Sequence, residues 1–234
     1  MSPFLYQIVH VAGRSPRYLS RHLEQLLDDA QRLYGRRWPL DVRQIEGEIL
    51  SRLDAENYPK DRSTALRLEL TPEGELRYHF VGDPLYWGYV LRVLRPVGYL
   101  RSFTLPWEGL CSSAERAAWQ LAESTIPRGV VIRCNEQGEI LEADGAPLFA
   151  LYGRTIYTSR EPRGVYGELA REAIRRAGYS LRIEPVAVEH LSLLDELFYL
   201  DHRGVTSLER YEGGKLLMTA VAKRIAEEME RLAR

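Results

Sequence analysis

The residues best suited to chemistry lie in three short stretches of the second half of the chain. Glu142 stands where an apolar run breaks into the small residues 143–146, and such a break lets a ligand approach the backbone. The stretch 164–167 (Gly-Val-Tyr-Gly) opens a helical pattern whose first amides could bind an anion. A charged loop, 201–203, follows another apolar run. These stretches could hold a small ligand that carries negative charge.

Short β-rich runs separated by turns surround Glu142. An Asn-Glu-Gln-Gly turn at 135–138 joins the first two runs, and a Gly-Arg turn at 153–154 joins the last two. Glycine turns between short β-rich runs are typical of antiparallel hairpins. The sequence therefore predicts an antiparallel meander over four segments: 130–134, 139–142, 148–152 and 155–158.

The first half of the chain predicts a smaller α+β domain. A strand over 4–11 precedes a helix over 21–34, which Ser20 would cap and Gly35 would end. Asp41 would cap a second helix. A hairpin with strands at 65–70 and 75–81 follows, and then a strand-like run at 86–94.

A Pro-Gly stretch, 95–98, reads as the linker between two domains. We expect domains at 1–95 and 101–234, joined by 96–100. In the second domain, Ser112 or Ser113 would cap a helix over 114–123. The other expected elements are helices at 166–177 and 216–234, a helical turn at 191–194, strands at 181–188 and 196–200, and a polar loop at 201–206. The predicted fold class is α+β, with an antiparallel meander in each half.

Composition excludes several classes of protein. The 234 residues include 32 basic and 33 acidic side chains, so the net charge of −1 offers no basic face for nucleic acid. No run of 18 apolar residues predicts a membrane span, and the N-terminus does not resemble a secretory signal. Two isolated cysteines, Cys111 and Cys134, predict neither a disulfide framework nor a metal site and favour a reduced, cytoplasmic protein.

Several stretches resemble the fold-type IV pyridoxal-phosphate (PLP) enzymes, which include branched-chain and D-amino-acid aminotransferases and aminodeoxychorismate lyases. The central stretch resembles the family pattern G-x-(I/V)-x-E-x-x-x-x-N-(I/L)-F, which ends in (I/L)-x-T. Pro147 replaces the Asn of that pattern. The matching residues are Gly138, Ile140, Glu142, Leu148, Phe149, Ile156 and Thr158.

Two further stretches extend the resemblance over nearly the whole chain. The spacing of Leu19, His22, Leu26 and Ala30 is similar to a helix signature of the family's small domain. Apart from the family, a single helical histidine such as His22 is more often a surface or capping side chain. The final third of the chain, from the helix at 166 to the loop after 200, is similar to the family's closing strand–helix–strand run.

The resemblance implies a two-domain fold, a PLP site in a cleft between the domains, and a homodimer. Its residues here are Glu142, Arg116, Gly164, Val165, Tyr166, Asp201, His202 and Arg203. Glu142 would face the pyridine nitrogen, while the stretches 164–166 and 201–203 would face the phosphate.

The Schiff-base lysine of the family has no counterpart here. The lyase pattern K-x-x-N-R places it on Ser112, and the branched-chain spacing places it on Glu108. The chain has 29 arginines but only three lysines: Lys60, Lys215 and Lys223. An internal aldimine requires a lysine amine, so we expect no covalently bound PLP and a cofactor that is non-covalent or absent.

Two functions remain open at this point. One is an aminotransferase- or lyase-like protein with reduced or lost PLP chemistry. The other is a non-catalytic homodimeric scaffold or small-anion binding protein on the same fold. The homodimer would bury an aromatic surface around Trp87, Trp107 and the tyrosines at 86 and 89.

Overall fold

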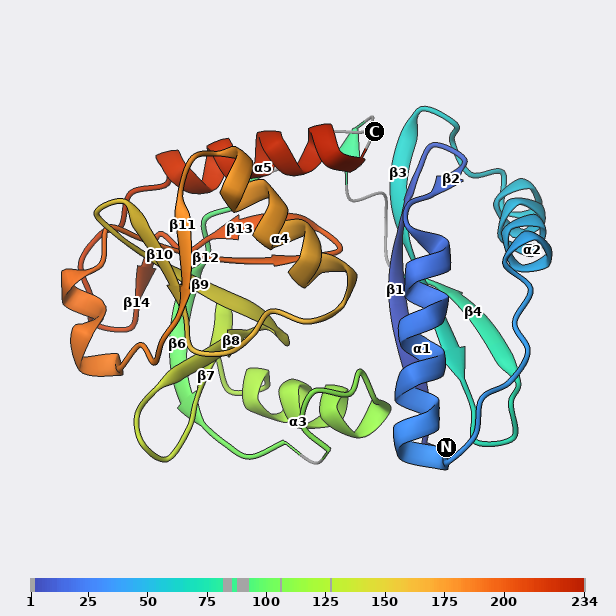
Figure 1. Ribbon diagram of the computed structural model, residues 1–234, viewed down its shortest axis with the longest axis horizontal. Helices are drawn as coiled ribbons and strands as arrows, with labels where there is room; N and C mark the ends of the chain where they lie inside the picture. Colours follow the sequence, from blue (N-terminus) through green and yellow to red (C-terminus); the bar gives the residue numbers. More distant parts are fainter. Residues whose placement is uncertain (1–2, 82–85, 88–92, 106, 127, 234) are drawn as a thin grey trace. The chain divides into compact units, whose positions relative to one another are not determined.

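The chain divides into two compact units in a computed structural model that describes residues 3–81, 86–87, 93–105, 107–126 and 128–233 (Figure 1). The first unit contains residues 1–90 and 107–116, and the second contains 91–106 and 117–234. The sequence placed the boundary at 95, and the two units divide between residues 90 and 91 and again at either end of 107–116. The short segment 107–116, which we assigned to the second domain, belongs to the first unit.

The first unit is built on a small antiparallel sheet. Its strands are β1 (Leu5–Ala12), β2 (Ser15–Pro16), β3 (Arg62–Leu70), β4 (Leu76–Phe80) and β5 (Tyr86–Trp87). The order is β2-β1-β3-β4, and β5 also pairs with β3. Strand β1 runs against β3 over its whole length, from Leu5 opposite Leu70 to Ala12 opposite Ser63. The predicted hairpin of β3 and β4 is present.

Two helices, α1 (Leu19–Tyr34) and α2 (Val42–Ala55), pack their apolar sides on this sheet. Gly35 ends α1 at a φ of 68°, as its sequence position predicts. Asp41 caps α2 by accepting the N–H groups of Arg43 and Gln44. The prediction that Ser20 caps α1 is wrong, because the helix begins two residues earlier than expected, and Tyr18 at the cap position makes no side-chain capping bond.

His22 is not a surface side chain. It is 1% exposed, and its Nδ1 lies 2.9 Å from Oε1 of Gln7 on β1. A buried imidazole needs such a partner, because an unbonded polar group in the core costs about 1–3 kcal/mol. The shared face of α1 and β1 therefore contains a polar pair inside an apolar layer.

The second unit contains a larger sheet around the predicted meander. Strands β7 (Val130–Cys134), β8 (Ile140–Ala143), β9 (Ala146–Tyr152) and β10 (Thr155–Thr158) pair in sequence, each antiparallel to the next. Asn135 shapes the β7–β8 turn, since its Oδ1 accepts the N–H groups of Gln137 and Glu139. The meander is confirmed.

Other strands make this sheet mixed rather than wholly antiparallel. Strand β6 (Val97–Ser102) is parallel to β7, β14 (Arg210–Tyr211) is parallel to β6, and β11 (Ser180–Ile183) is parallel to β10. The linker prediction is therefore wrong for residues 97–100, which form a strand. Strand β12 (Glu196–Asp201) pairs with β9 and with β13 (Gly204–Ser207). The predicted polar loop at 201–206 is thus largely a buried hairpin.

Helices and one 3-10 turn complete the described part of the second unit, although residues 113–116 at the start of the first of these helices belong to the first unit. Helix α3 (Ser113–Glu123) places Trp119 against Phe103 and Val131. Helix α4 (Gly164–Arg176) packs against β11, β12 and α5 (Ala220–Ala233), and the turn η1 (Val188–Leu193) precedes β12 (Figure 1). A continuous apolar cluster of residues from β7, β8, β9 and β12 forms the core. Helix α5 begins four residues later than predicted.

Candidate functional site

Residues 107–116 attach to the N-terminal strand of the first unit. The Tyr6 N–H donates to the Cys111 carbonyl at 2.8 Å. Phe4 and Ser113 exchange two hydrogen bonds, of 3.1 and 2.9 Å, and Leu5 bridges Ser112 in antiparallel pairing. The segment therefore extends the sheet edge at the start of β1.

Ser112, one of the two positions expected for the lysine, has a structural role. Its side chain is buried, and its Oγ accepts the Glu115 N–H at 3.2 Å, which caps α3. The cap prediction for Ser112 is confirmed. Glu108, the other position, is exposed. Arg116 lies in the same unit, where its side chain hydrogen bonds to the hydroxyl of the half-buried Tyr6.

Asp29 of α1 also holds this segment and should make the stability of the chain depend on pH. Its carboxylate accepts the Cys111 N–H, and burial raises its pKa to about 6 although Arg32 lies 3.8 Å away. Because the folded pKa of Asp29 is raised, the protonated carboxyl stabilises the folded chain. This stabilisation is fully present below the unfolded pKa of about 3.9. It is lost as the pH rises through about 6.

We therefore expect Asp29→Asn to leave stability unchanged near pH 4 and to increase it at pH 8 by about 2 kcal/mol. Urea unfolding at both pH values measures this difference. Asp28→Asn, on the exposed neighbouring carboxylate, is the matched control and should shift neither curve. Equal effects of Asp29→Asn at the two pH values would contradict the raised pKa.

In the second unit, Glu142 is held by two arginines. It stands on β8 directly opposite Arg133 of β7, and Nε of Arg133 donates to its Oε2 at 3.2 Å. A nitrogen of Arg160 lies 4.0 Å from Oε1. The Arg133 side chain is 3% exposed, that of Glu142 17% and that of Arg160 37%. This group of three, which we call the Glu142 cluster, has a net charge of +1.

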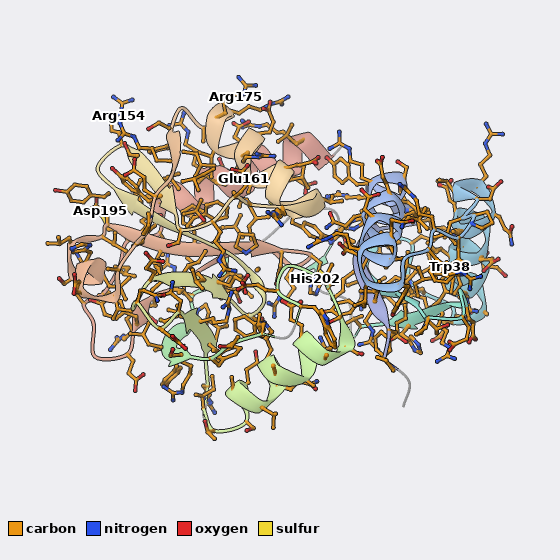
Figure 2. All side chains as sticks on the ribbon, turned by 60° about the horizontal axis from the view of Figure 1, so that its bottom comes forward. Trp38, Arg154, Glu161, Arg175, Asp195 and His202 are labelled. Atoms are coloured by element: carbon orange, nitrogen blue, oxygen red, sulfur yellow. The ribbon has the colours of Figure 1, made fainter. Side chains whose placement is uncertain are left out.

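The loop that contains Arg160 leads directly into α4. Thr158 donates its hydroxyl to the Arg160 carbonyl at 3.2 Å. Glu161, which Figure 2 labels, pairs with Arg171 about two helical turns inside α4. Arg163 at the helix cap makes no side-chain capping bond, and Gly164 has a φ of 71°. The tight approach at Gly167 leaves no room for a Cβ, which would lie 2.5 Å from the Pro162 backbone carbon.

The stretch 201–203 is the tight turn of the β12–β13 hairpin, where Asp201 pairs with Gly204 (Figure 2 labels His202). Nε of Arg203 donates to Oδ2 of Asp201 at 2.8 Å, and its backbone N–H donates to Oδ1 at the same distance. Nη2 of Arg203 bonds to the carboxylate of Asp144 in the β8–β9 turn and lies 3.5 Å from the Tyr199 hydroxyl. We call these four residues the Arg203 cluster.

The charges in the Arg203 cluster stabilise one another. Burial opposes ionisation of Asp201, but His202 and Arg203 outweigh it and hold the pKa of this carboxyl below its ordinary value. Burial likewise works against the charged Arg203, yet Asp201 and Asp144 raise its pKa. Burial raises the pKa of Tyr199, so its hydroxyl stays protonated at neutral pH. The cluster is therefore an ionised network with a neutral phenol.

The expected site residues separate into two sets. Arg116 lies in the first unit, while the other seven lie in the second. Glu142 and Asp144 are two residues apart, so β8 and its turn connect the Glu142 cluster to the Arg203 cluster. Sequence reasoning missed Arg133, Arg160, Asp144 and Tyr199. Arg133 could have been found, because the predicted β7–β8 hairpin places it near a residue of opposite charge.

The lysines, the possible metal ligands and the helix lengths bear on the kind of site and protein. All three lysines are exposed. The described ranges contain no group of three or more His, Cys, Asp or Glu residues that could hold a metal ion. No helix in the described part of the chain is long and apolar enough to cross a membrane.

Comparisons with known proteins agree on the architecture. No protein-family model and no curated protein matches the sequence. Among solved structures, a branched-chain amino acid aminotransferase described as putative, from Thermotoga maritima, superposes with a TM-score of 0.81 at 16% identity, covering 99% of this chain and 86% of that one.

Two further structures represent the cofactor and the lyase branch. An aminotransferase from Brucella abortus, solved with PLP, gives a TM-score of 0.78 at 16% identity over 98% of this chain and 89% of its own. A 4-amino-4-deoxychorismate lyase from Legionella pneumophila, also described as putative, gives 0.74 at 13% identity over 95% and 88%. Likeness at this identity establishes the fold, and the chain has the fold of the fold-type IV aminotransferases and aminodeoxychorismate lyases.

Proposed function

We propose that this chain is an aminotransferase- or lyase-like protein that has lost Schiff-base chemistry and binds a small anion instead. The observation that carries the proposal is that Ser112, one of the two positions expected for the lysine, is the N-cap of α3. Its hydroxyl already accepts the Glu115 N–H, and its side chain is 4% exposed. A serine hydroxyl cannot form an aldimine.

The surroundings of Glu142 also argue against PLP. When bound through a lysine, PLP serves as an electron sink whose pyridine nitrogen is held by an acid. Here the Glu142 carboxylate already accepts a bond from the guanidinium of Arg133, which is always protonated. A pyridinium would have to share this carboxylate with a buried cation. The residues present therefore do not fit a covalently held PLP, and we derive no step through it.

The Glu142 cluster supports anion binding. Its two arginines outnumber its one carboxylate, and Arg160 is the most exposed of the three. Arg160 lies four residues before Gly164, where the first turn of α4 lacks a side-chain cap. Helix N-termini and guanidinium groups both favour anions. A carboxylate is the ligand class that we propose, because its two oxygens match the planar donor group of an arginine.

Reductive trapping tests the loss of the amine. The purified protein is incubated with PLP, treated with borohydride and mapped by peptide mass spectrometry. We expect only substoichiometric labelling of Lys60, Lys215 and Lys223. A near-stoichiometric phosphopyridoxyl group on any of the three would overturn the proposal.

Calorimetric titration with malonate tests the anion site. Arg160→Gln is expected to weaken binding about tenfold, the loss of one charge-assisted interaction. Arg154→Gln is the matched control, because Arg154 is an exposed arginine in the neighbouring β9–β10 turn (Figure 2). Absence of malonate binding to the wild-type chain, or equal loss in the two variants, would refute the site.

We further propose a cytoplasmic homodimer. Trp107 supports a buried aromatic surface, since it is 60% exposed in the single chain. The side chains at 86 and 87, and residue 89 as a whole, lie outside the described residues. Cys111 and Cys134 are unbridged thiols, as expected in a reducing compartment. A monomeric mass by light scattering at micromolar concentration would contradict the dimer.

A further inference from the structure

The β12–β13 turn is held in a single conformation by its own hydrogen bonds. It has only two residues between the paired Asp201 and Gly204, and Gly204 itself has a φ of 106°, which favours glycine. Arg203 bonds through its backbone N–H and through Nε to the same carboxylate, Asp201. The turn and its arginine are therefore fixed by local bonds.

One contact of Arg203 is long-range. Its Nη2 bonds to Asp144, which is 59 residues away in sequence and occupies the β8–β9 turn at a φ of 52°. The Asp144 N–H in turn donates to the Val131 carbonyl on β7 at 3.1 Å. Arg203 thus connects two hairpins that do not follow each other along the chain.

We propose that Arg203 is a latch that ties the β12–β13 turn to the β8–β9 turn, and that it occupies the position where the fold resemblance assigns a phosphate loop. The Arg203 cluster would then serve to hold Glu142 and its strand in place. The proposal concerns structure and does not depend on the loss of the amine, so it can fail independently of the proposed function.

Charge counting supports the latch over a phosphate site. The Arg203 cluster contains two carboxylates and one guanidinium, so its net charge is −1 without His202. A phosphate dianion would find no excess positive charge, and at close range like charges repel strongly in a partly buried site. Arg203 would also have to abandon Asp201 and Asp144 to receive it.

The side chain of Arg203 also lies against a buried aromatic ring. Tyr199 is 1% exposed, and the Arg203 Cζ lies 5.8 Å from the centre of its ring. An aromatic face and two carboxylates form a suitable receptor for a guanidinium. A lysine could not make the paired bonds of the planar group. The chain thus builds a complete internal site for its own arginine.

Thermal unfolding of variants tests the latch. Arg203→Met is expected to lower Tm by more than about 4 °C, because it leaves the carboxylates of Asp144 and Asp201 without their guanidinium partner. Asp144→Asn should lower Tm less, and adding it to Arg203→Met should produce little further change. Additive effects, or a Tm shift below about 2 °C for Arg203→Met, would overturn the latch. If Arg203→Met does not fold, Arg203→Lys and Asp144→Asn form the same cycle.

Inorganic phosphate separates the latch from a phosphate site. The phosphate concentration is raised in tenfold steps, and Tm is measured for Asp144→Asn and Arg203→Met at each step. We expect Asp144→Asn to have the higher Tm, and the difference between the two variants to stay constant as phosphate is added. A rise in wild-type Tm with phosphate that disappears in Arg203→Met would show that Arg203 binds phosphate and would refute the proposal. The measurement needs no cofactor, so it is independent of the borohydride result.

The pH dependence provides a second readout. The folded pKa of Asp201 is depressed, so its contribution is present above the unfolded value of about 3.9 and is lost as the pH falls through the lower folded value. The Tm difference between wild type and Arg203→Met should therefore shrink only below about pH 4. A difference that is constant down to the lowest pH would contradict an ionised latch.

Discussion

Replacement of Arg133 with Met is expected to lower the free energy of unfolding by about 3 kcal/mol. The side chain of Arg133 is 3% exposed, and its Nε lies 3.2 Å from the Glu142 carboxylate. Methionine fills similar space but removes the nearer of the two guanidinium groups beside the half-buried Glu142 carboxylate, because the Arg160 nitrogen lies 4.0 Å away. Urea unfolding followed by circular dichroism measures the loss.

The double variant Arg133→Met, Glu142→Gln distinguishes the charge from the packing. Removing both charges should recover most of the loss, because a buried ion pair contributes little compared with an apolar replacement of similar size. The single change Glu142→Gln is the matched control within the cycle. A double variant as unstable as Arg133→Met alone would show that Arg133 acts through packing and not through Glu142.

Truncation of Glu196 to Ala is expected, in a separate variant, to lower the free energy of unfolding by about 3 kcal/mol. Glu196 lies on β12, is 1% exposed and accepts the N–H groups of Val221 and Ala222, both at 2.8 Å. It is thus a helix cap supplied from 25 residues away in sequence. Its loss leaves two first-turn amides of α5 without these acceptors.

Amide hydrogen exchange locates this effect. Exchange of Val221 and Ala222 should accelerate more than exchange in α4, because the cap acts on the first turn of α5. Glu227→Ala, at an exposed position of the same helix, is the matched control and should change stability by less than about 0.5 kcal/mol. Glu196→Gln should lie between the two. Equal losses for Glu196→Ala and Glu227→Ala would refute the capping role.

Local signals predicted the elements that local chemistry controls. Gly35 ends α1, Asp41 caps α2 and Ser112 caps α3, each through a bond within four residues. The Asn135 turn likewise fixes the β7–β8 hairpin by its own side chain. These bonds form in any context that permits the turn, so the residue types were sufficient to predict them.

Non-local pairing explains what the sequence did not reveal. The Pro-Gly stretch before residue 98 looks like a linker, but β6 is a strand because β7 pairs with it in parallel 32 residues later. The bond between Arg203 and Asp144 spans 59 residues and has no sequence signature. The charge state of the candidate site depends on these distant contacts. It could therefore be described only after the strands were placed.

The return of residues 107–116 to the first unit has a consequence for synthesis on the ribosome. That unit cannot close until the nascent chain has passed residue 116, and by then β6 of the other unit has already been made. The first unit therefore cannot fold completely before synthesis of the second unit has begun. A fragment cut at residue 95 would lack the Cys111 carbonyl that receives the Tyr6 N–H, leaving the start of β1 as an open edge for pairing with other molecules.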